Sequence, residues 1–157
     1  MRARHLDEID RAILDVIQSD ASTTLEAIGS VVGLSAAAVQ RRVQRHRSSG
    51  LISGSCTLLE PSAAGVPILV LTVVTLERDT VAVIDSFGKR VAAHPNVQQC
   101  YELAGRFDLA LLVVAPDMET YRHVVGELLD EDPNVARYSS HVTLRSLKRT
   151  LKLPVRG

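Results

Sequence analysis

Residues 35–50, with the sequence SAAAVQRRVQRHRSSG, form the segment that most limits how this chain can fold. They contain four arginines and one histidine but no acidic residue. Ser35 is a typical N-cap and Gly50 a typical helix stop, so the segment is predicted to form one helix. Val39 and Val43 lie one turn apart and predict a narrow buried face. We therefore expect the arginine-rich arc on the other side to be exposed.

The exposed arc combines small, amide and guanidinium side chains. Small residues permit close approach to a DNA major groove, amides pair with adenine, and guanidinium groups pair with guanine or phosphate. A basic helix can also be an ordinary solvated surface helix, so this segment alone leaves both interpretations open. Arg42 lies nearest the flank and is expected to pair with an acid of the first helix. The candidate DNA-binding residues are Ser35, Ala36, Ala37, Gln40, Arg41, Arg42, Gln44, Arg45 and Arg47.

Two further helices are predicted upstream of the basic one. Residues 6–20 have apolar side chains at a helical period and acids in the first turn. The next helix follows Thr23 and Thr24, either of which can be its cap, and Glu26 stands three residues after Thr23 in a capping-box arrangement. Gly33 then provides a tight turn. Two short helices joined by a glycine-containing turn, the second one basic, indicate a helix-turn-helix and favour DNA binding.

After residue 50 the pattern changes to alternating strands and helices. The run 66–77 is β-branched and almost wholly apolar, which predicts a central strand buried on both faces or a sheet interface. Pro and Gly punctuate residues 60–65, which we interpret as a linker. The predicted strands are 51–59, 66–77, 97–103, 109–115 and 135–147, and the predicted helices are 80–93 and 117–130.

The order β-α-β-β-α-β from residue 66 onward is typical of a ferredoxin-like fold. The predicted class is therefore α+β. The predicted domains are a helix-turn-helix domain with a short strand (1–59), a linker (60–65) and a ferredoxin-like domain (66–157).

The net charge is zero, but the basic residues are segregated. Both 35–59 and 145–157 contain basic residues and no acid, whereas the rest of the chain is acidic on balance. A protein with such local patches can bind a polyanion without a high overall pI. The tail 145–157 is thus expected either to touch flanking DNA or to extend, solvated, across a neighbouring subunit.

Composition narrows the remaining function classes. Hydrophobic residues make up 46% and charged residues 23% of the chain, which is typical of a globular protein. No apolar run is long enough for a membrane span or a signal peptide, so a cytoplasmic protein is expected. Cys56 and Cys100 show no metal-ligand spacing, and neither a zinc site nor a disulfide is expected. No nucleophile, acid–base or phosphate-loop motif indicates an enzyme or a cofactor site.

Taken together, the motifs resemble the Lrp/AsnC (feast/famine) family of transcription regulators over about residues 6–147. The segments that carry the resemblance are LDEIDRAIL at 6–14, VGLSAAAVQRRVQR at 32–45, GLISG at 50–54, AGRFDLAL at 104–111 and PDMETYR at 116–122. The resemblance implies an N-terminal helix-turn-helix and a ferredoxin-like effector domain. It also implies dimers that pair through their sheets and often assemble into octamers.

The resemblance further implies an amino acid or related metabolite as effector, bound at an interface between dimers. This sequence departs from the family at Arg106, where the loop usually has an acid, so effector binding could be kept, changed or lost. Arg106 could pair with an α-carboxylate or with Glu102, and Asp108 with an α-ammonium. The effector-binding residues carried over by position are Leu103, Ala104, Gly105, Arg106, Phe107, Asp108, Met118, His141, Val142 and Thr143.

These observations predict a sequence-specific, homo-oligomeric regulator that binds double-stranded DNA and responds to a small-molecule effector. Two alternatives remain open at this point. One is a DNA-compacting protein that binds without sequence preference, and the other is a metabolite-binding module whose helix-turn-helix serves only assembly.

Overall fold

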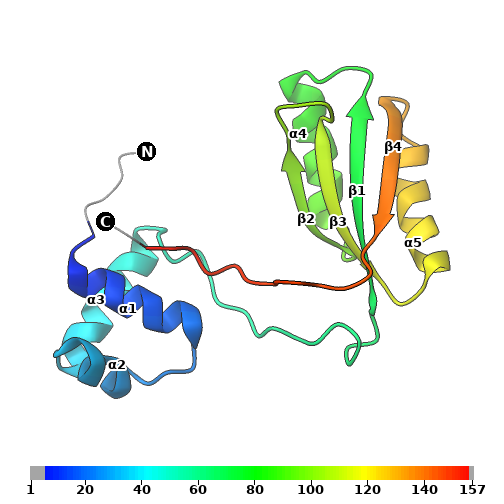
Figure 1. Cartoon of the computed structure of the whole chain (residues 1–157). Coiled ribbons are helices and arrows are strands. Elements are labelled where there is room, and N and C mark those ends of the chain that lie inside the picture. Colours follow the sequence, from blue (N-terminus) through cyan, green and yellow to red (C-terminus); the bar gives the residue numbers. More distant parts are fainter. Residues whose placement is uncertain (1–5, 156–157) are drawn as a thin grey trace. The chain divides into compact units, whose positions relative to one another are not determined.

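The computed structural model describes residues 6–155, which form five α-helices and a four-stranded sheet (Figure 1). One π-helical turn follows the last α-helix. In chain order the elements are α1 (Glu8–Ser19), α2 (Leu25–Val32), α3 (Ala36–Ser48), β1 (Ile68–Leu76), α4 (Val81–Ala93), β2 (Val97–Glu102), β3 (Leu109–Ala115), α5 (Met118–Val125), the π-helical turn (Gly126–Asp130) and β4 (Val135–Val142).

The chain separates into two compact units. Of the described residues, 6–57 form the first unit together with the tail 148–155, and residues 58–147 form the second. The tail contacts α1, where Gln18 Oε1 accepts a hydrogen bond from the Leu153 amide (2.8 Å) and Lys152 Nζ lies 3.0 Å from an Asp15 carboxylate oxygen. This grouping differs from the predicted one, which assigned the tail to the C-terminal domain. The limits 1–59, 60–65 and 66–157 remain predictions.

Side-chain caps set the starts of the three N-terminal helices. Asp7, Thr24 and Ser35 each accept a hydrogen bond from a backbone amide in the first turn of α1, α2 and α3, respectively. Thr24 is therefore the cap of α2, and the alternative cap Thr23 with its capping box is wrong. Gly33 ends α2 at φ +70°, a left-handed conformation that glycine adopts without strain.

A small aliphatic core holds the three helices together. Ile13, Ile28, Val39 and Val43 are buried against one another, one or two from each helix. The predicted valine face of α3 is confirmed, and it leaves the opposite side of the helix to solvent.

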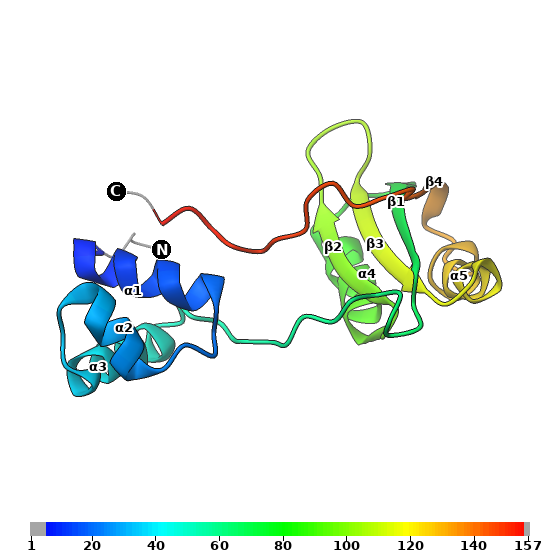
Figure 2. The ribbon, with the colours of Figure 1, turned by 60° about the horizontal axis from the view of Figure 1, so that its bottom comes forward.

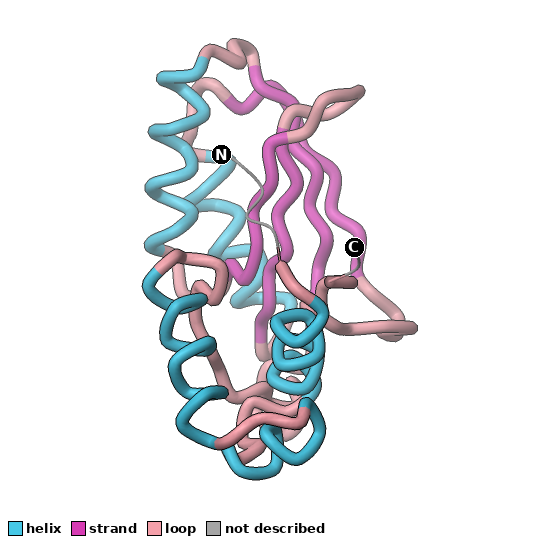
Figure 3. The backbone as a smooth tube through the Cα atoms, turned by 90° about the vertical axis from the view of Figure 1, so that its left-hand side faces the viewer, coloured by secondary structure: helices cyan, strands magenta, loops and turns pink. Residues whose placement is uncertain are grey.

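The second unit is an antiparallel sheet with the strand order β2-β3-β1-β4 (Figure 2). Helices α4 and α5 cover one face of it, as Figure 3 shows in cyan beside the magenta strands. The connections and strand order are those of the predicted ferredoxin-like fold. The α+β class is therefore confirmed.

Along β1, successive side chains point alternately to the helix-covered side of the sheet and to its open side. Val70, Thr72 and Val74 are fully buried on the helix side, where Thr72 shares a hydrogen bond with the Tyr121 hydroxyl (2.9 Å). On the open side Leu71 is 42% exposed. The sequence predicted that this strand is either buried on both faces or part of a sheet interface. Burial on both faces is wrong within the described chain, whereas an exposed apolar side chain on the open face is compatible with an interface.

Three predicted elements differ from the structure in type or by more than two residues at one end, and the others by two residues or fewer. No strand forms at 51–59 within the described residues, because this segment pairs with no other strand and is exposed apart from Ile52. The last strand ends at Val142 rather than at 147 because its pairing with β1 stops there. The predicted helix 117–130 changes from α to π geometry at Gly126.

Candidate DNA interface and effector site

The solvent side of α3 presents an arc of polar side chains. Ala37, Gln40, Arg41, Gln44 and Arg47 are exposed, whereas Val39, Val43 and His46 are buried. Ser35 is exposed at the N-cap and Ala36 is half-buried behind it. The arc therefore contains amide and guanidinium groups that no neighbouring element covers.

Two of the four arginines are held by acids of the first helix. Arg42 Nη1 donates to Asp7 Oδ2 (2.7 Å) and to Asp10 Oδ1 (2.8 Å), which confirms the pairing expected for Arg42. Arg45 Nη2 donates to both oxygens of Asp10, at 2.7 and 2.8 Å. The Arg45 pair was not foreseen, because the periodicity of α1 alone does not show which acid faces α3.

Asp10 is the centre of this cluster, which we call the Asp10 cluster: Asp7, Asp10, Arg42, Arg45 and His46. Asp10 is only 3% exposed. His46 Nε2 lies 3.0 Å from Asp10 Oδ1 but does not make a hydrogen bond to it. Burial raises the pKa of the Asp10 carboxyl, but the contacts with Arg42 and His46 and the charge of Arg45 outweigh burial and leave that pKa lowered.

The remaining arginines have different surroundings. Among the ion pairs of the described residues, none includes Arg41 or Arg47. Arg41, Arg42 and Arg45 line a hollow of about 450 Å³ together with Leu34 and Ala38. A polyanion would meet one unpaired guanidinium there and two that the acids of α1 hold in place.

The candidate effector loop lies between β2 and β3. Asp108 closes it, because its carbonyl oxygen accepts from the Leu103 amide (2.8 Å) and its Oδ2 from the Leu76 amide of β1 (2.7 Å). This carboxylate oxygen therefore already has a partner within the protein. The predicted Arg106–Glu102 pair is absent from the described chain, and the Arg106 guanidinium instead lies 5.6 Å from the centre of the Phe107 ring.

Three of the predicted effector residues share one hollow. Arg106, Phe107 and His141 line a space of about 260 Å³ on the open side of the sheet. Sequence reasoning missed its other lining residues, since only the pairing of β1 with β4 brings them beside the loop. These residues are Val73, Thr75, Arg137, Tyr138 and Ser139.

The other predicted effector residues are not gathered at that hollow. Met118 follows β3, whereas the loop precedes it, so they lie at opposite ends of a seven-residue strand, about 20 Å apart. Val142 is half exposed at the end of β4, and Thr143 just beyond it donates its amide to Leu69. Leu103, Ala104 and Gly105 are exposed on the loop. One chain thus does not assemble the ten predicted residues into a single pocket.

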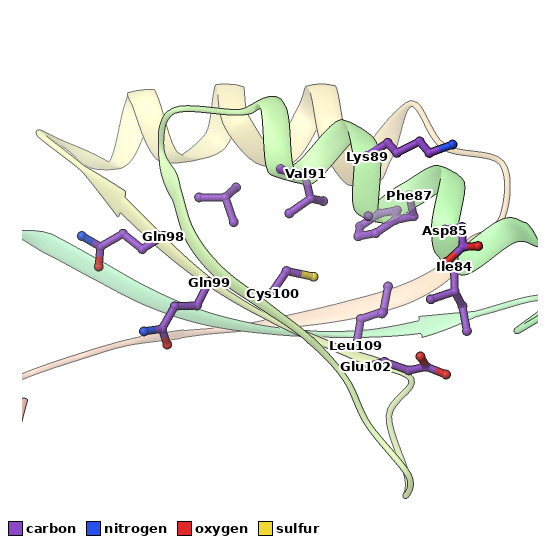
Figure 4. Close-up of a pocket in the computed structure, with 13 residues that line it drawn as sticks. Ile84, Asp85, Phe87, Lys89, Val91, Gln98, Gln99, Cys100, Glu102 and Leu109 are labelled. Atoms are coloured by element: carbon purple, nitrogen blue, oxygen red, sulfur yellow. The ribbon is translucent and has the colours of Figure 1, made fainter. Parts of the chain in front are cut away.

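A second hollow, of about 780 Å³, lies between α4 and β2, and no predicted effector residue lines it. Figure 4 shows Phe87 and Val91 of α4 turned toward Cys100 and Leu109 of the sheet. Burial raises the pKa of the Cys100 thiol. The hydrophobic periodicity of α4 indicated the apolar wall but not an open groove.

The described part of the chain gives little support to a metal site, a disulfide or a membrane-spanning helix. Residues 6–155 contain no group of three His, Cys, Asp or Glu side chains placed to hold a metal ion. Cys56 and Cys100 are both free thiols. None of the helices described here is long and apolar enough to cross a membrane.

Comparison with known proteins decides the family. The AsnC-type helix-turn-helix domain matches residues 6–45, and the Lrp/AsnC ligand-binding domain matches residues 69–153, which is more than half of the chain. The protein belongs to the Lrp/AsnC family. It is a transcription regulator with a DNA-binding helix-turn-helix domain and a ligand-binding domain, and the family consists of regulators rather than enzymes.

This Lrp/AsnC-family chain resembles characterised relatives over nearly its whole length. It is 31% identical over 150 residues to the transcriptional regulator AzlB of Bacillus subtilis, covering 96% of both chains. It is 32% identical over 153 residues to the leucine-responsive regulatory protein of Escherichia coli, covering 98% of this chain and 93% of that one. The structure of a Neisseria meningitidis regulator in complex with L-methionine has a TM-score of 0.87 to it at 27% identity, covering 96% of this chain and 97% of that one.

Proposed function

We propose that this protein is a sequence-specific, homo-oligomeric regulator whose assembly or DNA affinity responds to an amino acid or related small metabolite. The observation that carries the proposal is the exposed arc of α3. Gln40, Arg41 and Gln44 are solvent-exposed on the side opposite the buried valines. Side chains of these types read base edges and bind phosphates when a helix enters the major groove.

A ligand response is supported by the domain that follows. The ligand-binding domain of the family covers residues 69–153, and the N. meningitidis relative was solved with L-methionine. Arg106 and Phe107 of the loop line a hollow of about 260 Å³ together with His141, which is space for a small ligand.

The proposed mechanism is geometric. Dimers that form through the effector domains would set the distance between two copies of α3, ideally about one helical turn of DNA, ~34 Å, or a multiple of it. A ligand with different affinities for two assemblies would shift their populations and thereby change which spacing is presented. The protein would act in the cytoplasm on double-stranded DNA.

Selection of bound genomic DNA fragments, with and without pooled amino acids, tests the DNA-binding part. We expect a few fragments to be enriched, and footprinting of one fragment to give a discrete protected site in the presence of competitor DNA. Uniform coverage would instead support the compaction alternative. Failure to bind any DNA at low salt would support a metabolite-binding module.

Calorimetric titration of the full-length protein with individual amino acids and related metabolites tests the ligand response. We expect at least one of them to give heat and to raise the thermal unfolding temperature, because a ligand that binds only the folded state stabilises it. A complete panel without heat or thermal shift would contradict the ligand response while leaving DNA binding to be judged by the fragment selection.

A further inference from the structure

The hollow beside the effector loop is lined by basic side chains and by no acid. We propose that this hollow, lined by Arg106, Arg137 and His141, binds a small dicarboxylate without an ammonium group in preference to an amino acid with a neutral side chain. The inference rests on the proposed function, because it narrows the ligand class of the effector domain. It also adds Arg137, which neither the sequence motifs nor the family match assigns to the site.

The basic side chains come from two separate segments. Arg106 lies on the loop before β3, whereas Arg137 and His141 lie on β4, four residues apart and thus on the same face of that strand. The residues that line the hollow include no carboxylate. Two permanent positive charges and a titratable imidazole therefore surround a space of about 260 Å³.

Nothing in the described chain neutralises these groups. Asp108, the acid of the loop 103–108, uses Oδ2 to accept from the Leu76 amide at 2.7 Å. Within residues 6–155 no ion pair involves Arg106, Arg137 or His141. The Arg106 guanidinium stays near the loop through its contact with the Phe107 ring, 5.6 Å from the ring centre. An anion in the hollow would supply the missing counter-charge.

The number of arginines argues for two carboxylates. A guanidinium pairs with one carboxylate through two parallel hydrogen bonds, so two arginines suit a ligand with two such groups. An amino acid with a neutral side chain brings one carboxylate and one ammonium, and no acid lines the hollow to receive the ammonium.

Isothermal titration of the full-length protein with succinate tests the proposal, with L-leucine, L-methionine and inorganic phosphate as comparison probes at constant ionic strength. We expect succinate to bind at least tenfold more tightly than each of the other three. Arg106→Gln and Arg137→Gln should each weaken succinate binding at least tenfold. Arg145→Gln removes an exposed arginine that does not line the hollow and should leave the affinity unchanged.

Circular dichroism of each variant confirms that it is folded, and DNA binding is measured on the same samples. No succinate binding, tighter binding of leucine, methionine or phosphate, or equal affinity in the arginine variants and the wild type would overturn the proposal. DNA binding that responds to an amino acid but not to succinate would contradict only this inference. Succinate binding by a protein that binds no DNA would contradict only the proposed function.

Discussion

Asp10 links the stability of the first unit to its candidate DNA-binding surface. Its carboxylate is buried, and it holds both Arg42 and Arg45 at hydrogen-bonding distance. A buried charge needs partners, and here the partners are side chains of the helix that is expected to meet DNA. The orientation of Arg45, which remains 56% exposed, therefore depends on an acid in another helix.

Replacing Asp10 by Asn should lower the free energy of unfolding by about 2 kcal/mol, because Arg42 and Arg45 lose their buried counter-charge. Urea unfolding at pH 7 measures the change. Asp15→Asn is the matched control on the same helix, since Asp15 pairs with Lys152 at the surface and should cost less than about 0.5 kcal/mol. Equal losses in the two variants would contradict the role given to the Asp10 cluster.

The lowered pKa of Asp10 also predicts a pH dependence. A carboxyl whose folded pKa lies below its unfolded value, about 3.9, stabilises the fold fully above that pH and loses the effect as pH falls through the folded pKa. Unfolding free energies measured from pH 6 downward should therefore fall below about pH 4. In the Asp10→Asn variant the free energy of unfolding should decrease less steeply as the pH is lowered. It should still decrease, because the pKa values of Asp7, Asp20 and Asp132 are lowered too.

Gly29 is a position in the helix-turn-helix where an added side chain would collide with the backbone. A Cβ there would lie 2.4 Å from the Leu34 backbone oxygen, so Gly29→Ala should destabilise the first unit by about 2 kcal/mol in thermal or urea unfolding. Gly88 in α4 has no atom within 4 Å of an added Cβ, and Gly88→Ala should be neutral or stabilise by about 0.5–1 kcal/mol. A neutral Gly29→Ala variant would show that the turn can move away from α2.

At the scale of the element, some arginines of α3 form ion pairs within the first unit and others remain exposed without one among the described residues. The acids of α1 hold Arg42 and Arg45, while Arg41 faces solvent without an ion pair in the described chain. Charge reversal at Arg45 would place a second carboxylate against Asp10 and disturb folding as well as binding. Arg41 is therefore the informative position for testing contact with DNA.

Arg41→Ala should weaken binding to a selected DNA fragment about tenfold and make the slope of log K against log salt shallower by about 0.9, the effect of one lost phosphate contact. Mobility-shift titrations at several salt concentrations provide both values. Arg122→Ala removes an exposed arginine of α5 and should change neither. An unaltered affinity for Arg41→Ala would remove this side chain from the interface.

At the scale of the whole molecule, the part of the open side of the sheet around Leu71 is a candidate surface for self-association, and it borders the hollow because Leu71 pairs in register with His141. Leu71 projects from the central strand β1 and is 42% exposed in the single chain, as expected of an interface residue before its partner is added. Leu71→Asp should reduce the mass measured by size-exclusion chromatography with light scattering, because a charge would be buried between sheets. Val81→Asp, at an exposed position on α4, should leave the mass unchanged, and an unchanged mass for Leu71→Asp would place the interface elsewhere.

Local patterns in the sequence determined the helices, most strands and the family. Caps such as Ser35 and Asp117, the period of Val39 and Val43, and the apolar runs 66–77 and 109–115 each act through neighbours in the chain, and so they can be recognised without a structure. The segment 51–59 was misassigned because a strand needs a partner, and β propensity does not show that one is present.

Only the tertiary structure decided which side chains meet. The Asp10 cluster joins residues more than thirty positions apart. The cationic hollow depends on the register between β1 and β4, which brings Arg137 and His141 beside Arg106. Distant contacts of this kind depend on how helices and strands pack in three dimensions, and no pattern of neighbouring residues specifies that packing.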